Sequence, residues 1–393
     1  MTQVRLRNKH DRRVRAGHPW VFSNEIDGDV ASLPVGGVVD VVDAKGAWLG
    51  RGFSHPGALL AVRIVTRNRD ESPDDLGFWE SRLRRALALR TALWPDRRSY
   101  RLVYAEGDGL GGLIVDRYDN VLVAQLNTTG VDIRRDLVAK ALQNVVAPAG
   151  ALLRNDGHSR RFEGLADEVA VWFGAVPETV DIDEYGTRLR VDLRVGQKTG
   201  HFFDHADNRR FFAPLCAGRS VLDVFSHTGA WGLAALRAGA ASALLVDRSE
   251  SALNGAVTNA SLNDLTVQTR VGDAREVLNS LGLEGRLFGA IVVDPPAFAR
   301  SRNTAGAALR GYRQVNAAAL RLLEPGGFFA TASCSHHVEE QRFLETICDA
   351  ATDAGRSLTL LRRGEQAPDH PMPPQVPETR YLKCFVFRVE GGP

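Results

Sequence analysis

The sequence predicts an α/β protein of more than one domain: a small β-barrel or sandwich, then a central α+β segment, then a doubly wound parallel sheet. Three observations predict this organisation. The 393 residues exceed what one hydrophobic core usually serves. Short runs of β-forming residues separated by glycine fill the first seventy positions. After about Gly196, strands and helices alternate, as they do around a parallel sheet.

The composition is that of a soluble globular protein, with 44% hydrophobic and 24% charged residues. The N-terminus lacks the apolar core of a signal peptide, and no apolar run approaches the length of a membrane span. The four cysteines show no C-x-x-C pair and no metal-ligand spacing, so no metal is expected. These features predict reduced thiols and a cytoplasmic location, with no membrane partner.

Positive charge gathers near the N-terminus, although the net charge of the chain is only +2. Such a cluster fits either a phosphate-facing surface or a solvated basic face. Its members are Arg5, Arg7, Lys9, Arg12, Arg13 and Arg15, with Asp11 as the one nearby acid.

The first two segments are read from their periodicity. Strands are expected over residues 36–42, 48–53 and 59–65, as in a small barrel or sandwich. A helix is expected from Leu76 to about Trp94, where Pro95 ends it. Residues 112–116 and 121–126 read as a hairpin, and a helix follows at about 134–146. This central segment shows no chemistry of its own.

Apolar β runs follow at residues 220–224, 242–246, 266–271, 290–293 and 327–332, separated by helical patterns. In a doubly wound sheet, ligands bind outside the carboxyl ends of the strands. The polar residues that follow these runs are therefore the candidates for a functional site.

Three aspartates follow the first three of these runs. Asp223 opens a turn in which an acid suits the ammonium and sulfonium cation of S-adenosylmethionine better than a phosphate. Asp247 is placed to bind ribose hydroxyls, and Asp273 to accept from the adenine amino group. A single aspartate after a strand is most often a turn former or helix cap, but three in order on consecutive strands favour the cofactor. The expected site also includes Phe225, Ser226, Gly229, Arg248 and Ala274.

The fourth run ends in Asp294-Pro295-Pro296. Two prolines fix an extended backbone and remove two amide donors, so the carboxylate is presented rigidly, as a base edge requires. This motif indicates methylation of a planar nitrogenous substrate, with Asp294 as a cofactor and substrate residue.

The fifth run places Cys334 at the same rim, where a substrate meets the methyl donor. A thiolate that adds to carbon 6 of cytosine activates carbon 5 for methylation, which makes Cys334 the candidate nucleophile. Cys216, Cys348 and Cys384 read as small buried hydrophobes. His336 and His337 are candidates for proton transfer or simply surface histidines.

Motifs along nearly the whole chain resemble one family, the bacterial and archaeal large-subunit ribosomal RNA cytosine-5 methyltransferases that carry an N-terminal PUA domain. The Gln-Lys-Thr-Gly stretch leading to Asp204 and Arg209 is the most specific of them. The motifs are His18-Pro19-Trp20-Val21-Phe22-Ser23, Ala105-Glu106-Gly107-Asp108-Gly109-Leu110, Arg154-Asn155-Asp156, Gly196-Gln197-Lys198-Thr199-Gly200, Asp294-Pro295-Pro296, Ser333-Cys334-Ser335, Asp369-His370-Pro371 and Tyr381-Leu382-Lys383.

The resemblance implies a PUA-like β-barrel that binds RNA over residues 1–72, a central α+β domain over 73–192 and a Rossmann-like class I methyltransferase domain over 193–393. It implies S-adenosylmethionine as the cofactor, Cys334 as the nucleophile, and Lys198, Thr199 and Gly200 as residues that help close the cofactor site. The expected partner is large-subunit (23S) ribosomal RNA, naked or in an assembling subunit, and relatives of this kind can form homodimers.

Two departures from the family pattern concern the site. His227 and Ala230 stand where the family usually has tyrosine and glycine, and His205-Ala206 stand in place of Gln-Arg. The second cysteine of some other RNA cytosine-5 methyltransferases is also absent from the fourth-strand motif. Two other functions remain open at this point: methylation of a purine at N7 or an amino group, and a non-catalytic role in RNA binding or ribosome assembly.

Overall fold

The computed structural model of the chain describes residues 2–194, 196, 199–299 and 301–391. These residues group into two compact units. The first runs to Ile182 and adds Val191–Phe203 and Pro368–Thr379. The second comprises Asp183–Arg190, Asp204–Ala367 and the residues from Arg380 onward. The domain boundaries expected near residues 72 and 192 remain a prediction.

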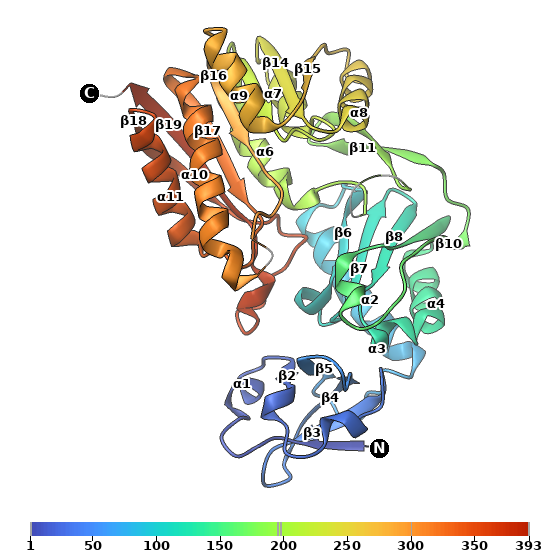
Figure 1. The fold of residues 1–393 in the computed structure, drawn as a ribbon. Helices are drawn as coiled ribbons and strands as arrows, with labels where there is room; N and C mark the ends of the chain where they lie inside the picture. The colour runs from blue at the N-terminus through green and yellow to red at the C-terminus, as the bar shows by residue number, and fades with distance from the viewer. Residues whose placement is uncertain (1, 195, 197–198, 300, 392–393) are drawn as a thin grey trace. The chain divides into compact units, whose positions relative to one another are not determined.

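The first sheet of the first unit has the strand order β1-β3-β4-β5-β2. It belongs to the dark blue part of the ribbon in Figure 1. Its elements are β1 (Thr2–Arg5), α1 (Arg12–Arg15), β2 (Trp20–Phe22), β3 (Val38–Val42), β4 (Trp48–Ser54) and β5 (Leu60–Thr66). The three expected strands are confirmed as β3, β4 and β5. Alternate residues such as Val39 and Val62 are fully buried in the core, which explains the apolar pattern of the strands.

The N-terminal basic cluster is partly neutralised within this sheet region. Arg13 forms an ion pair with Glu25 at 3.2 Å, and Arg15 pairs with Asp11 and Asp43. The positive charge available to an external phosphate is therefore smaller than the sequence cluster alone indicates.

The second sheet of the first unit has the order β10-β9-β8-β7-β6. Its elements are α2 (Leu76–Leu93), β6 (Ser99–Tyr104), β7 (Leu113–Tyr118), β8 (Val121–Leu126), α3 (Thr129–Asp132), α4 (Arg135–Val146), β9 (Gly150–Asn155), α5 (His158–Arg161) and β10 (Glu168–Gly174). The expected helices and the β7–β8 hairpin are confirmed, the latter in antiparallel register from Leu113↔Leu126 to Tyr118↔Val121. Apolar side chains of α2, α4 and the sheet share one core. A hairpin of β11 (Thr179–Glu184) and β12 (Thr187–Asp192) follows.

The sheet of the second unit has the order β15-β14-β13-β16-β17-β19-β18. Its strands are β13 (Ser220–Val224), β14 (Ser242–Asp247), β15 (Gln268–Val271), β16 (Phe288–Val293), β17 (Leu323–Ser333), β18 (Arg356–Gly364) and β19 (Lys383–Gly391). Strands β13 to β17 pair in parallel, as expected for a doubly wound sheet. The sequence reasoning missed β18 and β19, and β19 is antiparallel to both of its neighbours.

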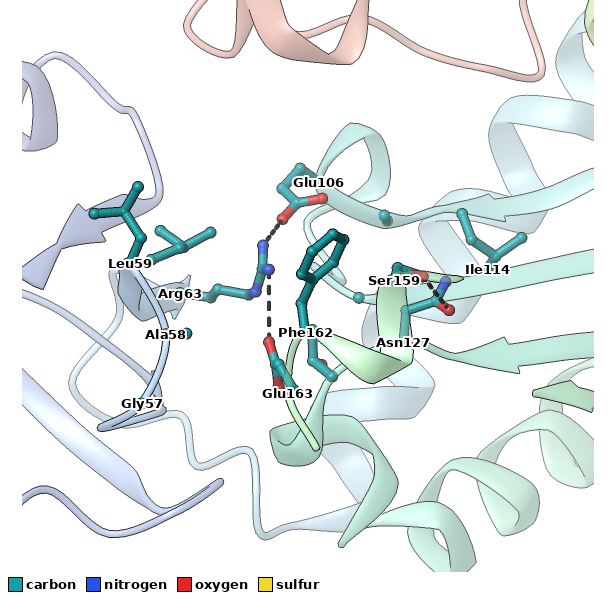
Figure 2. A pocket seen from close by; sticks show the side chains of 14 residues that line it. Gly57, Ala58, Leu59, Arg63, Glu106, Ile114, Asn127, Ser159, Phe162 and Glu163 are labelled. Atoms are coloured by element: carbon teal, nitrogen blue, oxygen red, sulfur yellow. Dashed lines mark hydrogen bonds and ion pairs between the residues drawn. The ribbon is translucent and has the colours of Figure 1, made fainter. Parts of the chain in front are cut away.

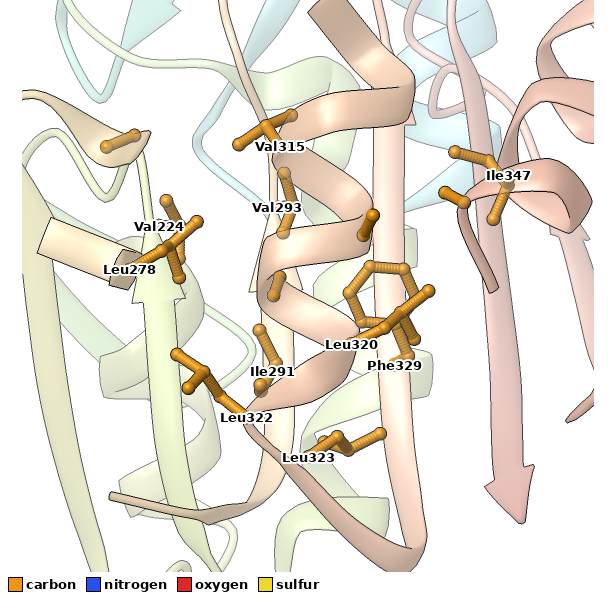
Figure 3. Close-up of a cluster of buried hydrophobic side chains, with 14 of the residues drawn as sticks. Val224, Leu278, Ile291, Val293, Val315, Leu320, Leu322, Leu323, Phe329 and Ile347 are labelled. Carbon is orange, nitrogen blue, oxygen red and sulfur yellow. The ribbon is translucent and has the colours of Figure 1, made fainter. Parts of the chain in front are cut away.

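Helices cover both faces of this sheet. They are α6 (Ala206–Phe212), α7 (Ala230–Arg237), α8 (Glu250–Ser261), α9 (Ala274–Leu283), α10 (Ala305–Arg321) and α11 (Glu340–Asp353). Along β16, Ile291 and Val293 pack into the core beneath α9, α10 and α11 (Figure 3). Ala290 and Val292 point into the opposite core, with side chains of α6, α7 and α8. Because both faces are buried, the strand reads as a continuous apolar run.

The described helices include none with the combined length and apolar composition that crossing a membrane requires.

Candidate active site

The carboxyl ends of β13 to β17 meet at one edge of the parallel sheet, and backbone hydrogen bonds tie the segments beyond them together. The Ser226 amide donates to the Val246 carbonyl at 3.0 Å, and the Asp294 amide donates to the Val224 carbonyl at 3.3 Å. The topology thus gathers most of the sequence-predicted residues at this edge. They are Asp223, Phe225, Ser226, Gly229, Asp247, Arg248, Asp273, Ala274, Asp294 and Cys334.

The turn between β13 and α7 has three residues in left-handed backbone conformation. Phe225 has φ 65°, His227 has φ 49° and Gly229, which precedes α7, has φ 83°. Two of these are not glycine, and such strain concentrates at ligand-binding sites. The His227 amide donates to Asp247 Oδ2 at 2.9 Å. Since the backbone amide donates this bond, it does not depend on the imidazole of His227.

Asp223 is fully buried at the end of β13, and only one of its carboxylate oxygens is paired. Oδ2 accepts the Gly232 amide of α7 at 2.9 Å, while no described residue hydrogen-bonds to Oδ1. Burial raises the pKa of this carboxyl to about 7. Ser226 Oγ nearby in the turn is also buried without a hydrogen-bond partner among the described residues. An unpaired carboxylate oxygen and hydroxyl fit a cationic, hydrogen-bond-donating ligand such as the methionine part of S-adenosylmethionine.

Asp247 and Asp273 differ in burial and in the hydrogen bonds that their carboxylates accept. Asp247 is half-buried, and each of its oxygens accepts one backbone amide, from His227 and from Ser249 at 2.9 Å. Each oxygen retains a lone pair for a hydroxyl group. Asp273 is exposed and caps α9 through the Arg275 amide at 2.9 Å, so the helix-cap interpretation holds for this residue. Ala274 is buried, and Arg248 is exposed.

Asp294 is held by two side chains that the sequence reasoning did not assign to it. Trp231 Nε1 donates to Oδ2 at 3.2 Å, and His205 Nε2 lies 3.3 Å from Oδ1. His205 is itself buried, against the Trp231 ring at 5.4 Å between centroids. The residue that departs from the family pattern at position 205 therefore faces this carboxylate.

Cys334 is half-buried and directly follows β17. The antiparallel pairing of β17 with β19 sets Ser333 opposite Lys383. The Lys383 ammonium donates to the Ser335 carbonyl at 2.6 Å. Burial lowers the pKa of Lys383 to about 8, against the opposing effect of a negative charge on Cys334. A cation thus lies within electrostatic reach of the thiol.

Tyr312 of α10 contacts the residues on both sides of Cys334. Its hydroxyl accepts from Ser333 Oγ at 3.0 Å and lies 3.1 Å from Ser335 Oγ, which fixes the residues on both sides of Cys334. Burial raises the pKa of Tyr312, so its hydroxyl stays protonated at neutral pH.

The four cysteines, all within the described part of the chain, form no disulfide. Cys216 and Cys384 are buried, as expected. The expectation was wrong for Cys348, which is exposed on α11. A helix presents its apolar and polar faces every third or fourth residue, and Cys348 falls on the outer face, directly after the buried Ile347.

The Gln-Lys-Thr-Gly stretch lies in the first unit where it is described. Thr199 Oγ1 donates to Asp116, and the Tyr118 hydroxyl donates to the Thr199 carbonyl at 3.1 Å. Gly200 has φ 124°, and a Cβ there would lie 3.2 Å from the Tyr118 hydroxyl. Lys198 lies outside the described residues. Its expected role, and those of Thr199 and Gly200, remain predictions.

The residues that the sequence reasoning missed are His205 and Trp231 beside Asp294, and Tyr312 and Lys383 around Cys334. The motif Tyr381-Leu382-Lys383 was a signal for Lys383, but its place beside β17 depends on an antiparallel strand that the alternating pattern does not reveal. Asp294 and His205 are separated by a long stretch of sequence, which no periodicity connects.

Comparison with known protein families gives two matches along the chain. A PUA-like domain matches residues 4–67, and the S-adenosylmethionine-dependent methyltransferase family matches residues 89–388. The chain is also 39% identical to the ribosomal RNA large subunit methyltransferase I of Shewanella frigidimarina, over 98% of this chain and 99% of that protein.

Solved structures share the fold. A Streptococcus mutans protein described as a candidate S-adenosylmethionine-dependent methyltransferase superposes with a TM-score of 0.85, covering 99% of this chain and all of that one at 20% identity. A candidate methyltransferase complexed with SAH matches with the same coverage, identity and TM-score. The architecture is therefore that of a class I methyltransferase preceded by a PUA-like domain.

Proposed function

Because the chain belongs to the S-adenosylmethionine-dependent methyltransferase family, we propose that it methylates carbon 5 of a cytosine in large-subunit ribosomal RNA. The single observation that carries this proposal is Cys334, a thiol beside the Lys383 ammonium at the sheet edge where Asp223 and Asp294 also lie. The relative from Shewanella frigidimarina, named for large-subunit ribosomal RNA, supports the substrate.

S-adenosylmethionine supplies an electrophilic methyl group when it is bound. Asp223 and Ser226 would hold its charged methionine part, because their unpaired oxygens need donors. Asp247 would accept from the ribose hydroxyls, and Asp273 and Ala274 would border the adenine. Phe225, Gly229 and Arg248 complete the proposed set, and Lys198, Thr199 and Gly200 would help close it.

Cys334 would act as the nucleophile on the base. Its thiolate would form a bond from Sγ to carbon 6 of cytosine, and the electron pair of the 5,6 double bond would move to carbon 5. Carbon 5 would take the methyl group as its bond to the sulfonium sulfur breaks, which leaves S-adenosylhomocysteine. Transfer of the carbon 5 proton to water and cleavage of the Sγ–C6 bond would restore the double bond and the thiolate. The Lys383 ammonium stabilises the thiolate before attack, because an adjacent positive charge favours the ionised form.

Asp294 would hold the edge of the base. Its carboxylate accepts from the exocyclic amine of cytosine or shares a proton with the ring nitrogen, which stabilises the charge that builds up during thiolate addition. Trp231 and His205 fix the orientation of this carboxylate from the protein side. The two prolines that follow it keep the backbone rigid.

A base in folded RNA reaches such a site only when it leaves its stack, so we expect the target cytosine to be flipped out. The PUA-like domain and the central sheet would position the RNA through phosphate and shape contacts.

The test is product identification. The protein is incubated with deproteinised, unmodified 23S RNA and methyl-labelled S-adenosylmethionine, and the RNA is then digested to nucleosides. Label in 5-methylcytidine is the expected result. Label in a methylated guanosine or adenosine would contradict the cytosine assignment and leave Cys334 with a structural role. If no label appears with naked RNA or with an assembling subunit while cofactor still binds, the catalytic proposal fails.

A further inference from the structure

Arg63 and two carboxylates form an ion-pair group at a cavity of about 480 Å³ in the first unit. Arg63 Nη1 donates to Glu106 Oε1 at 2.9 Å, and Arg63 Nη2 lies 3.6 Å from Glu163 Oε1 (Figure 2). The guanidinium is thus paired within the protein, and this group calls for no ligand. A polar network in the second unit differs, because it ends at Asp294, a half-buried residue of the proposed site.

The network joins the side chains of Asn208, His205 and Asp294. His205 is the N-cap residue of α6 and Asn208 lies in its first turn, so the two side chains share one face of the helix. Asn208 Nδ2 lies 3.3 Å from His205 Nδ1, and His205 Nε2 lies 3.3 Å from Asp294 Oδ1. Both Asn208 and His205 are buried. The imidazole therefore lies between an amide and a carboxylate.

The backbone of Glu365 determines which way the Asn208 amide faces. The Glu365 carbonyl can only accept, and Asn208 Nδ2 donates to it at 3.1 Å. A flipped amide would set one oxygen against another at this contact. The two hydrogens on Nδ2 are therefore directed to the Glu365 carbonyl and to His205 Nδ1. Asn208 Oδ1 stays buried with no hydrogen-bond partner among the described residues.

This arrangement leaves His205 one favourable tautomer. Its Nδ1 faces an N–H of Asn208 and must present a lone pair, so the ring proton lies on Nε2. Its Nε2 faces the Asp294 carboxylate, which attracts an N–H and repels a lone pair. The amide on one side of the ring and the carboxylate on the other thus select the same tautomer.

We propose that Asn208 is a positioning residue, which fixes His205 in the Nε2–H tautomer and thereby holds Asp294 in the orientation that a base requires. Trp231 Nε1 donates to Asp294 Oδ2 at 3.2 Å, so each carboxylate oxygen then faces one N–H of the protein and keeps a lone pair for the base. The inference rests on the proposed function in one respect, which is that Asp294 contacts the base. The glutamine of the family pattern at position 205 would also present an N–H.

The direct test is the tautomer of His205 in the full-length protein labelled with nitrogen-15 histidine. Two-bond proton–nitrogen correlations distinguish the tautomers, and the His205 signals are those absent from His205→Gln. In neutral buffer we expect a protonated Nε2 and an unprotonated Nδ1. Asn208→Asp places an acceptor beside Nδ1, which should then carry a proton. A protonated Nδ1 in the unchanged protein, or an unaltered His205 spectrum in Asn208→Asp, would overturn the proposal.

The matched control is Asn316→Asp on α10. Asn316 is also fully buried, its Oδ1 has no hydrogen-bond partner among the described residues, and its Nδ2 donates to a backbone carbonyl at 2.7 Å. This variant should leave the His205 signals unchanged.

Gly364→Ala tests the same contact without altering Asn208, and it decides the matter if Asn208→Asp does not fold. An added Cβ at Gly364 would overlap Asn208 Oδ1, so the amide should be displaced from the imidazole. The signals of a single Nε2–H tautomer should then be lost, and their persistence would contradict the proposal.

Turnover distinguishes positioning from a purely structural role. Asn208→Leu, which keeps the volume and removes the amide, should lower kcat roughly tenfold and change the KM for RNA less, since orientation matters most in the transition state. In the His205→Gln background, Asn208→Leu should cause no further loss, because Asn208 acts through His205. Losses that multiply would overturn the proposal. If His205 has the expected tautomer but the unchanged protein methylates no RNA, the proposed function fails while the tautomer assignment stands.

Discussion

Among the proposed cofactor residues, Asp223 has an environment that is costly for the protein without a ligand. The carboxyl is fully buried, one oxygen is satisfied by the Gly232 amide, and no described residue pairs with the other. Burying a carboxylate without full compensation is unfavourable, which is why the pKa of Asp223 rises to about 7. A bound cation would supply the missing partner.

The raised pKa predicts a pH dependence of stability. An unfolded aspartate has a pKa of about 3.9, so between about pH 4 and pH 7 the unfolded chain has released a proton that folded Asp223 still holds. The cofactor-free protein should therefore lose stability as pH rises through this window. Asp223→Asn removes that loss, so the variant should gain stability relative to the unchanged protein between pH 5 and pH 8, while losing cofactor affinity at least tenfold.

Thermal unfolding at the two pH values, with calorimetric titration of S-adenosylmethionine, measures both effects. Asp273→Asn is the control for the stability measurement alone, because asparagine also caps helices and Asp273 is exposed. An equal stability difference at pH 5 and pH 8 for Asp223→Asn would contradict the assignment of an uncompensated buried carboxyl.

The positive charge of Lys383 should make the Cys334 thiol more reactive. Lys383→Met removes the neighbouring cation, so the thiolate fraction of Cys334 at pH 7 should fall, and alkylation by iodoacetamide should slow roughly tenfold. Because Lys383 loses its charge as pH rises through about 8, the difference between the two proteins should shrink above that pH. Peptide mass spectrometry separates Cys334 from the exposed Cys348, whose alkylation rate should not change. Equal rates at Cys334 in both proteins would exclude this role for Lys383.

At the scale of elements, the parallel part of the second sheet follows from the sequence, and the antiparallel edge does not. Buried strands such as β16 appear as short apolar runs between amphipathic helices, so β13 to β17 and the residues after them could be predicted. Strand β19 enters between β17 and β18, and nothing local in its sequence specifies that pairing. The same insertion brings Lys383 beside Cys334, so the residue was missed because the strand was missed.

The turn between β13 and α7 predicts a strict requirement for glycine at position 229. Its φ of 83° strains other residues, and an added Cβ would lie 2.9 Å from Leu245 Cδ1 and 3.0 Å from Ala256 Cβ. Gly229→Ala should lower the free energy of unfolding by about 1–2 kcal/mol and weaken cofactor binding. Gly306→Ala on α10, where a Cβ meets open space, should be neutral or slightly stabilising in the same urea titration. Equal stabilities of the two variants would contradict the strain assigned to this turn.

At the scale of the whole molecule, each compact unit is made of segments that are not contiguous in sequence. Reading a sequence from end to end yields contiguous domains, whereas the first unit includes Pro368–Thr379 from near the C-terminus. Within that unit the buried Arg90 guanidinium donates to the Asp369 carbonyl at 2.6 Å, and the Arg101 amide donates to the Asp369 carboxylate at 2.9 Å. Composition and periodicity carry no information about contacts over such separations, so the sequence could not place this segment.

Asp369 should therefore be important for stability although it is not among the proposed site residues. Asp369→Ala removes a buried acceptor from the Arg101 amide and a partner from His370, and should cost about 2–4 kcal/mol of unfolding free energy. Asp349→Ala, which breaks an exposed ion pair with Arg313, should cost less than about 1 kcal/mol. Urea unfolding of both full-length variants compares them, and similar losses would contradict the structural role of the Pro368–Thr379 segment.

The most direct test of the covalent mechanism is to trap the adduct on Cys334. 23S RNA transcribed with 5-fluorocytidine is incubated with the protein and S-adenosylmethionine. Since carbon 5 then carries fluorine in place of the proton that must leave, the Sγ–C6 bond should persist after methylation. We predict a protein–RNA complex that survives denaturation, maps by mass spectrometry to the Cys334 peptide, and is absent with Cys334→Ala. A complex at another cysteine, or no complex while 5-methylcytidine forms on ordinary RNA, would contradict Cys334 as the nucleophile.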